Sequence, residues 1–487
     1  MAAGDLVASV PSVASVASVA SVASVPSPEP SGALGVREPS WAPARPVRVA
    51  LLGLGHVGSA VAELLSTRAE EIATRTGVRF ELAGIAVHDL RRPRRSGDAD
   101  ARLLTDDAKA LVERPDVDVV VELIGGLDPA RALVEAALRA GKPVVSANKV
   151  LLAQAGAELS EIASANGVDL LYEAAVAGAI PVIRPLRESL AGERVLRVMG
   201  IVNGTTNYIL SRMTEDAMDY ADALAEAQQL GLAESDPSAD VSGDDAAAKA
   251  AILAGLAFGS DVLGTTVPRE GITGIRALDV AYAARLGYVI KLLAIAELVE
   301  GGPDVSVRVY PAMVPVSHPL ASVRGAFNAV FVEGEAAGEL MLYGRGAGGT
   351  PTSSAVLGDL IDAARNLIAG AHAPPPRRSP TTVRPVDELH SPFYISLDVL
   401  DRPGVLADVA AAFGTHDVSI RAMEQDGLGT GARLVFLTHA AREGDLRATL
   451  HALEAIETVV RVGSVLHVIG DDDGVPVRVR ETPPASR

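Results

Sequence analysis

An acidic and a basic side chain stand four residues apart in an alanine-rich segment. They are Asp245 and Lys249, and the positions between 246 and 251 other than Lys249 are all alanine. Residues four apart on a helix lie on one face, one turn apart. Most such pairs are surface ion pairs, but the small neighbours here let another element approach closely. Because a lysine can release a proton and an arginine cannot, we expect Lys249 to act as a general acid.

Lysine is rare in this chain, which otherwise uses arginine as its basic residue. The five lysines are Lys109, Lys142, Lys149, Lys249 and Lys291. In such a chain a lysine more often than usual occupies a position where arginine cannot substitute. The loop before residue 244 also carries Glu234, Asp236 and Asp240, and a loop rich in acids suits the binding of a substrate ammonium group.

A glycine motif follows the short apolar segment 47–52. It reads Gly53-x-Gly55-x-x-Gly58 and opens a helix-like stretch that runs through residue 65. In this context the glycines permit a tight turn and a close approach of the backbone to a pyrophosphate, which the helix N-terminus attracts. A tight turn with no ligand is the weaker alternative. We therefore assign Gly53, Gly55, Val57 and Gly58 to a dinucleotide cofactor.

The choice between the two nicotinamide cofactors depends on the end of the second predicted strand, 78–87. Asp89 could bind the adenosine ribose hydroxyls of NAD, whereas Arg91 and Arg92 could bind the 2′-phosphate of NADP. We favour NADP, with NAD as a possible second cofactor. A solvated basic loop with no ligand is nearly as good an interpretation.

The alternation of strand-like and helix-like segments from residue 47 predicts an α/β protein with a parallel, Rossmann-type sheet. A chain of 487 residues exceeds one typical core, so several packed units are expected. The expected division is a disordered tail at 1–46, a dinucleotide-binding domain at 47–180 completed by a returning helix near 345–372, an α+β substrate and oligomerisation domain at 181–344, a linker at 373–391, a ferredoxin-like β-α-β-β-α-β unit at 392–470 and a tail at 471–487.

Composition argues against several classes of function. The net charge of −18 and the lack of a basic stripe with aromatics disfavour nucleic-acid binding, and every apolar run is too short to cross a bilayer. The absence of cysteine removes thiolate metal sites and the nucleophile that aldehyde-oxidising enzymes commonly use. The first 46 residues show no leader pattern. We expect a cytoplasmic protein that binds small molecules.

Several blocks in this order resemble the homoserine dehydrogenase family, whose members interconvert aspartate semialdehyde and homoserine. The resemblance covers 47–368 and rests on the blocks 53–58, 121–126, 146–149, 172–181, 200–209, 234–249 and 344–348. The unit at 392–470, with Asp401-Arg402-Pro403-Gly404, resembles an ACT domain, an amino-acid-sensing module. The resemblance implies a monofunctional enzyme of threonine, methionine and isoleucine biosynthesis. The rival interpretation is a catalytically inactive amino-acid sensor.

The resemblance implies a role for each matching residue. Lys249 would donate the proton, Asp245 would help to hold substrate, and Lys149 would lie near both nicotinamide and substrate. Glu234 would receive the substrate amino group, and Asp240 would belong to the same wall of the substrate site. Gly231 and Gly348 would lie close to the cofactor. A monovalent cation, usually sodium, would bind main-chain oxygens at Glu173, Val176, Gly178 and Ile180. At one position the chain departs from the family, because Leu232 stands where many members have tyrosine.

The ACT-like unit predicts an amino-acid effector, for which threonine is the family's usual choice. The loop Asp401, Pro403 and Gly404 precedes a helix whose exposed amides could receive a carboxylate, and Val418 and Ile420 could line the pocket from a neighbouring copy. A homodimer or homotetramer is therefore expected. The alternative is a unit that only adds contacts between subunits.

Overall fold

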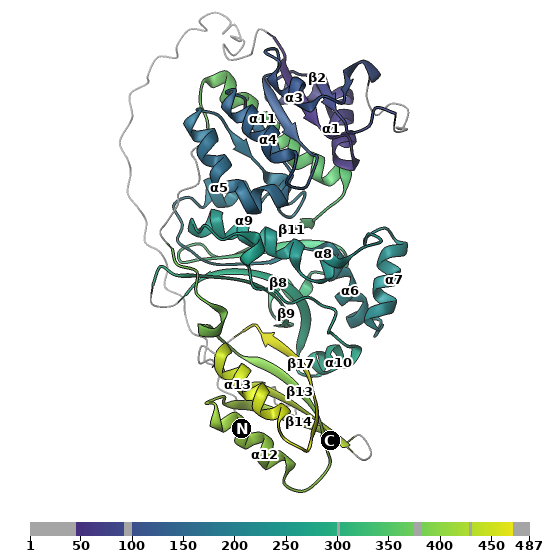
Figure 1. Cartoon of the computed structure of the whole chain (residues 1–487), viewed down its shortest axis with the longest axis vertical. Helices are drawn as coiled ribbons and strands as arrows, with labels where there is room; N and C mark the ends of the chain where they lie inside the picture. Colours follow the sequence, from purple (N-terminus) through teal and green to yellow (C-terminus); the bar gives the residue numbers. More distant parts are fainter. Residues whose placement is uncertain (1–44, 92–99, 300–301, 374–380, 428–430, 471–487) are drawn as a thin grey trace, which may run out of the picture. The chain divides into compact units, whose positions relative to one another are not determined.

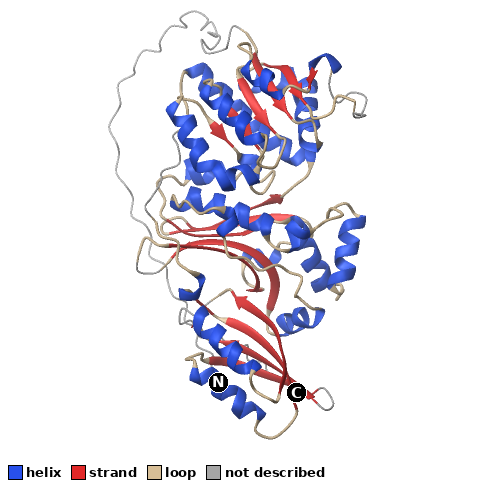
Figure 2. Ribbon diagram, viewed as in Figure 1, coloured by secondary structure: helices blue, strands red, loops and turns tan. Residues whose placement is uncertain are grey.

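The computed structural model describes residues 45–91, 100–299, 302–373, 381–427 and 431–470. Most of the predicted tail at 1–46, the tail at 471–487 and Arg92 lie outside these residues. Two large sheets organise the described chain, one all parallel and one mixed (Figure 2). In the part of the chain that the structure describes, no helix is both long and apolar enough to span a membrane.

The first sheet has six parallel strands and confirms the predicted Rossmann-type fold. Its spatial order is β3 (Leu104–Thr105), β2 (Phe80–Ala86), β1 (Val47–Leu52), β4 (Val119–Glu122), β5 (Val144–Ser146) and β6 (Leu170–Leu171). The strand order reverses at β1, which is where doubly wound sheets bind their ligands. The strands predicted at 78–87 and 117–124 are shorter than expected, and the two-residue β3 was not predicted because it is too short to show a pattern.

Helices cover both faces of this sheet (Figure 1). They are α1 (His56–Thr67), α2 (Ala69–Thr76), α3 (Ala108–Glu113), α4 (Ala130–Arg139), α5 (Lys149–Ala165) and α11 (Gly349–Ala369). Helix α11 comes from much later in the chain and packs against α1, because Val356, Leu360 and Ala364 share a core with β1 and β4. Helix α4 begins at Ala130, so Pro129 is its N-cap residue and not its first residue as predicted.

The second sheet has nine strands, and the sequence did not predict that it runs from the central region into the ACT-like unit. Its order is β11 (Gly338–Arg345), β10 (Phe327–Gly334), β7 (Val195–Ile201), β8 (Tyr288–Leu298), β9 (Val305–Pro315), β17 (Val459–Val468), β13 (Phe393–Leu400), β15 (Gly431–Thr438) and β14 (Ile420–Gly427). The last four strands belong to the ACT-like unit. They continue the sheet of the central region through a parallel pairing of β17 with β9, in which His467 lies opposite Ala312.

Helices from both regions pack on this continuous sheet. Those of the central region are α6 (Gly204–Glu215), α7 (Tyr220–Gln229), α8 (Ser238–Val241), α9 (Asp244–Phe258) and α10 (Ala277–Arg285), and those of the ACT-like unit are α12 (Val405–Thr415) and α13 (Glu443–Glu454). Helices α12 and α13 cover one face of their four strands. On the other face Tyr394, Leu437 and Leu466 join the core of the central region. The ACT-like unit is therefore packed into the fold.

Residues in the predicted linker also take part in the sheet. Val305 of β9 donates its N–H to the Thr382 carbonyl oxygen at 2.9 Å, and Arg384 donates its N–H to the Val305 carbonyl oxygen at 2.9 Å. The Arg384 guanidinium also pairs with Asp304 at 2.7 Å. The segment that leads into the ACT-like unit is thus fixed to the start of β9 from residue 382 onward.

We predict that alanine destabilises the protein at one glycine of the first turn and not at another. A Cβ at Gly58 would lie 2.2 Å from the Gly53 carbonyl oxygen, whereas a Cβ at Gly55 would meet no atom within 4 Å. Gly58→Ala should therefore lower the free energy of unfolding by about 1–3 kcal/mol, and Gly55→Ala should change it by less than about 0.5 kcal/mol. Urea denaturation of both variants measures the difference. Equal stabilities would contradict the close contact at Gly58.

Candidate functional site

Three of the predicted site residues meet in one buried cluster. Lys249 and Asp245 lie one turn apart on α9, and the Lys249 ammonium donates to Asp245 Oδ2 at 2.6 Å and to the Val202 carbonyl oxygen at 2.7 Å. Lys149, the first residue of α5, donates to the other carboxylate oxygen of Asp245. The parallel sheet thus supplies one lysine and the central region supplies the other, and Asp245 joins them.

Burial and charge set the protonation of this cluster. Burial acts to raise the pKa of Asp245, but the ammonium groups of Lys249 and Lys149 outweigh it and hold that pKa well below its usual range. Burial lowers the pKa of Lys249, although Asp245 opposes the shift. The carboxylate therefore stays ionised, while the lysine gives up its proton more readily than a lysine in water.

Asn203 belongs to the same cluster, although its place in the sequence did not indicate a role in the site. Its side-chain amide donates to Asp240 Oδ1 at 2.7 Å and to Asp245 Oδ2 at 2.9 Å. It is also the N-cap residue of α6, since its Oδ1 accepts the Thr206 N–H at 2.9 Å. The pattern of Asn203 followed by Gly204 and Thr205 could have indicated the cap, but nothing in it indicated the two acids.

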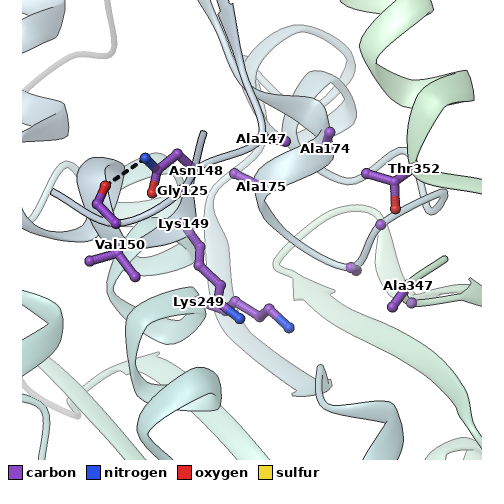
Figure 3. Close-up of a pocket in the computed structure, with 14 residues that line it drawn as sticks. Gly125, Ala147, Asn148, Lys149, Val150, Ala174, Ala175, Lys249, Ala347 and Thr352 are labelled. Atoms are coloured by element: carbon purple, nitrogen blue, oxygen red, sulfur yellow. Dashed lines mark hydrogen bonds between the residues drawn. The ribbon is translucent and has the colours of Figure 1, made fainter. Parts of the chain in front are cut away.

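A cavity of about 250 Å³ lies beside the two lysines (Figure 3). Its lining comes from the loops after β4, β5 and β6, the segment before α11, and the helices α5, α9 and α11. The lining residues are Gly125, Gly126, Ala147, Asn148, Lys149, Val150, Ala174, Ala175, Ala177, Gly178, Lys249, Gly346, Ala347 and Thr352. Figure 3 shows Lys149 and Lys249 side by side at this cavity. Both lysines therefore belong to the wall of one cavity.

A buried carboxylate shapes one wall of the cavity. Glu122 ends β4 with no exposed surface, and its carboxylate accepts from the backbone N–H groups of Ile124 at 2.8 Å and Gly125 at 3.2 Å. The Ser146 hydroxyl donates to it at 2.6 Å. Asn148, the N-cap residue of α5, donates to the Gly126 carbonyl oxygen at 2.7 Å. These bonds fix the Gly125–Gly126 turn and the start of the helix that carries Lys149.

The glycine motif forms the turn between β1 and α1. Gly53 has a φ of +102° and packs against the Leu123 backbone, which leaves no room for a side chain. Gly55 is exposed, with open space at its Cβ position, and Val57 is half-buried in the first turn of α1. A Cβ at Gly349 would lie 2.8 Å from the His56 carbonyl oxygen, so the start of α11 packs against the start of α1.

The predicted adenosine-binding residues are only partly described. Arg91 is exposed, and its backbone N–H donates to Asp89 Oδ1 at 2.8 Å. Arg92 lies outside the described residues. Asp89 and Arg91 therefore follow β2 at the carboxyl edge of the sheet, the edge at which dinucleotides bind in this type of fold.

The predicted cation residues lie together in the buried loop after β6. Glu173, Val176, Gly178 and Ile180 are all buried, and the loop bends at Ala177 and Gly178, which have φ values of +56° and +57°. The Glu173 carboxylate accepts from the backbone N–H groups of Val182, Ile183 and Arg184 at 2.5–2.9 Å. Within the described residues no group of three His, Asp or Glu side chains could hold a metal ion.

The remaining predicted residues lie outside the lining of the cavity. Glu234 is exposed, Gly231 and Gly348 are exposed with positive φ, and Asp240 is half-buried and joined to the cluster through Asn203. In the ACT-like unit Asp401, Pro403 and Gly404 are exposed before α12, where Gly404 has a φ of +97°. Val418 is buried beneath that helix, and Ile420, the first residue of β14, is half-buried.

Three family models match this chain. Residues 53–173 match the homoserine dehydrogenase NAD-binding domain, residues 181–361 match homoserine dehydrogenase, and residues 393–458 match the ACT domain. The glycine motif and all of the cavity lining except Ala174, Ala175, Ala177 and Gly178 therefore fall within the matched residues.

Similar whole proteins point the same way. The homoserine dehydrogenase of Mycobacterium tuberculosis is 52% identical over 436 residues, which covers 88% of this chain and 98% of that protein. The Corynebacterium glutamicum enzyme is 50% identical over 437 residues, with 89% and 98% covered. A crystal structure of a homoserine dehydrogenase from Thiobacillus denitrificans superposes with a TM-score of 0.83 at 40% identity, covering 87% of this chain and 98% of that one. The chain belongs to the homoserine dehydrogenase family.

Proposed function

We propose that Lys249 is the proton donor in the interconversion of aspartate semialdehyde and homoserine, the NAD(P)-dependent reaction of this family. The observation that carries the proposal is the sharing of one buried carboxylate, Asp245, by two lysines beside a cavity at the carboxyl edge of the nucleotide-binding sheet. The nicotinamide supplies the hydride that reduces the aldehyde carbon. The residues of the chain orient the substrate and manage the proton.

The burial of Lys249 favours it over Lys149 as the group that donates the proton. Lys249 is buried, and burial lowers its pKa, so transfer of its proton to a developing alkoxide costs less than it would from a solvated lysine. Asp245 keeps Lys249 and Lys149 together through its two oxygens. We assign to Lys149, which is half-buried at the cavity, the task of contacting the substrate oxygen and relaying protons. In the reverse direction neutral Lys249 accepts the proton of the homoserine hydroxyl.

The pH dependence follows from this assignment. Reduction needs protonated Lys249, so its rate should fall as the pH rises through the lowered pKa of Lys249. Oxidation needs the neutral lysine, so its rate should rise over the same interval. If the rate of reduction falls and the rate of oxidation rises over the same pH interval, one group, Lys249, controls both directions.

Acidic residues beyond the cavity are assigned to the substrate amino group. Asp240 lies one hydrogen bond from the cluster through Asn203, and Glu234 lies in the exposed segment before α8. A carboxylate near an ammonium group favours its binding and selects amino-acid substrates over simple aldehydes. Leu232 replaces the family's frequent tyrosine here, so no phenol from that position contributes.

The glycine turn fits a dinucleotide. The open space at Gly55 and the N-terminus of α1 suit a pyrophosphate, and we assign Gly53, Gly55, Val57 and Gly58 to its binding, with Gly231 and Gly348 near the nicotinamide half. NADP is the cofactor we propose, because Arg91 and Arg92 follow β2. A hyperthermophilic archaeal homoserine dehydrogenase, 28% identical with a TM-score of 0.55, has been solved in complex with NADPH.

The loop after β6 fits a monovalent cation through its chemistry. Main-chain oxygens of Glu173, Val176, Gly178 and Ile180 are hard ligands of the kind that sodium prefers. The left-handed residues Ala177 and Gly178 fold the loop back on itself within the cavity wall. A bound cation would add a fixed positive charge there and stiffen the wall next to the nicotinamide.

The ACT-like unit is proposed to bind threonine and to lower activity. Its exposed loop at Asp401, Pro403 and Gly404 presents the N-terminus of α12 to a carboxylate, and Val418 and Ile420 would line the pocket in a homodimer or homotetramer. An effector can change activity only if its binding alters how the ACT-like unit contacts the catalytic part of the chain. One such contact is α10, which bonds to β14 through Tyr282 and Asp426 and packs against α6.

We predict that Lys249→Arg lowers turnover by roughly two orders of magnitude or more while cofactor affinity stays near normal, because arginine keeps the charge but not a transferable proton. The measurement is nicotinamide absorbance with homoserine and with aspartate semialdehyde. Lys109→Arg is the matched control, since Lys109 is exposed and only pairs with Glu113. Turnover near that of the parent chain in Lys249→Arg would remove Lys249 from the mechanism.

We predict that replacing both Arg91 and Arg92 with alanine weakens NADP more than NAD, because only NADP carries the phosphate that the guanidinium groups could bind. Fluorescence titration of each reduced cofactor measures both affinities on the same preparation. NAD is the internal control. If the affinities for NADP and NAD fell equally, these arginines would not bind the 2′-phosphate, and other residues would set the cofactor preference.

The regulatory route predicts that effector binding and inhibition can be separated. The double variant Tyr282→Phe, Arg285→Ala removes the contacts of α10 with Asp426 and Glu424 on β14. Threonine should still bind by calorimetry, but its inhibition of turnover should weaken several-fold. Arg194→Ala, which breaks an exposed ion pair with Glu335 away from α10, is the control. Unchanged inhibition would exclude α10, and no threonine binding to the parent chain would exclude threonine.

A further inference from the structure

Two carboxylates of the cluster share a single amide. The Asn203 side chain donates one hydrogen to Asp240 at 2.7 Å and the other to Asp245 at 2.9 Å. Asn203 is 6% exposed, so water cannot easily replace these bonds. Two acids near each other repel, and a donor between them reduces that cost. Asn203 therefore joins Asp240, the acid proposed to bind the substrate amino group, to Asp245, the carboxylate between the two lysines.

The orientation of this amide is fixed by the helix that it caps. Its Oδ1 accepts from the Thr206 N–H at 2.9 Å and from the Thr206 hydroxyl at 3.0 Å. The oxygen is thus committed to α6, which leaves the NH₂ group facing the acids. The preceding residue contributes as well, since the Val202 carbonyl oxygen accepts from Lys249 at 2.7 Å. One turn of backbone holds Asp240, Asp245 and Lys249 together.

Helix α6 is itself anchored by a buried polar contact one turn further on. The Asn207 amide donates to the carbonyl oxygens of Gly325 at 2.9 Å and Phe327 at 3.0 Å. The ammonium of Lys291, on β8, donates to Asn207 Oδ1 at 3.0 Å. Burial lowers the pKa of Lys291 to about 8, yet the residue lies away from the cavity lining. These bonds tie the start of α6, and with it Asn203, to the sheet.

We propose that Asn203 is a positioning residue that holds Asp240 toward the substrate amino group and Asp245 toward the two lysines. It acts through these acids and is not itself a proton donor in the reaction. The proposal rests on the proposed function, because it assigns Asn203 its task within that reaction. It predicts that the amide's two hydrogens matter more than its size or its role as a cap.

The test is Asn203→Asp in the full chain. Aspartate has nearly the same shape and caps helices as well as asparagine, but it has no hydrogen to donate and adds a third carboxylate. We expect kcat to fall about tenfold to a hundredfold, as for loss of hydrogen bonds to charged groups. We also expect KM for the amino-acid substrate to rise, since Asp240 loses its support.

A pH profile separates positioning from a merely structural role. Lys249 is faced by Asp245, Lys149 and Asp240. An added carboxylate beside Asp245 favours the ammonium form and raises the pKa of Lys249. Because reduction needs protonated Lys249, the decline of the reduction rate at high pH should move to higher pH in Asn203→Asp. A loss of stability alone would lower the rate without moving this decline.

Two further variants close the test. Asn166→Asp is the control, because Asn166 is exposed and caps the end of α5 with one bond to Ile162; it should keep the parent rate and profile. Asn203→Ser keeps a helix cap and one hydrogen-bond donor without adding charge. Its kcat should therefore fall, but its rate of reduction should decline with rising pH over the same interval as in the parent chain. Rates within twofold of the parent for both Asn203 variants would overturn the positioning role. An inactive parent chain would instead contradict the proposed function.

Discussion

The carboxylate of Asp245 is the interaction on which the site depends. A buried carboxylate is costly unless charges and donors surround it, and here two ammonium groups and one amide do so. These partners come from α5, α9 and the start of α6, so the bond pattern requires the parallel sheet and the central region to meet at this point. Removal of any one partner would take away part of the charge or hydrogen bonding that stabilises the buried carboxylate.

The surrounding structure serves this meeting point. Glu122 fixes the Gly125–Gly126 turn after β4, the glycines at 53 and 58 bring β1 and α1 into close contact, and α11 returns to pack on α1. Each is a packing or hydrogen-bonding device with no chemistry of its own. Together they place the edge that binds nucleotides next to the helix that carries Lys249. A cavity with two ammonium groups at one side is the result.

The sequence predicted much of this arrangement, because strong local patterns carried it. The alternation from residue 47, the glycine motif and the four-residue spacing of Asp245 and Lys249 each have one dominant structural meaning. What it missed depends on partners far apart in the chain. Nothing near Asn203 indicates that Asp240 and Asp245 will converge on it, and no local pattern reveals the pairing of β17 with β9. The roles of individual residues toward cofactor, cation and effector remain predictions.

The pairing of β17 with β9 also affects how the chain folds while it is being synthesised. A ribosome makes β9 long before β17, so the end of the β9 edge at Ala312 and Met313 has no partner strand while the ACT-like unit is being synthesised. Unpaired edges are where nascent chains associate wrongly. The last strand to emerge is the one that covers this edge. A chain that ends before β17, even after a complete Asp245 cluster, would therefore keep this strand end exposed and open to pairing with another chain.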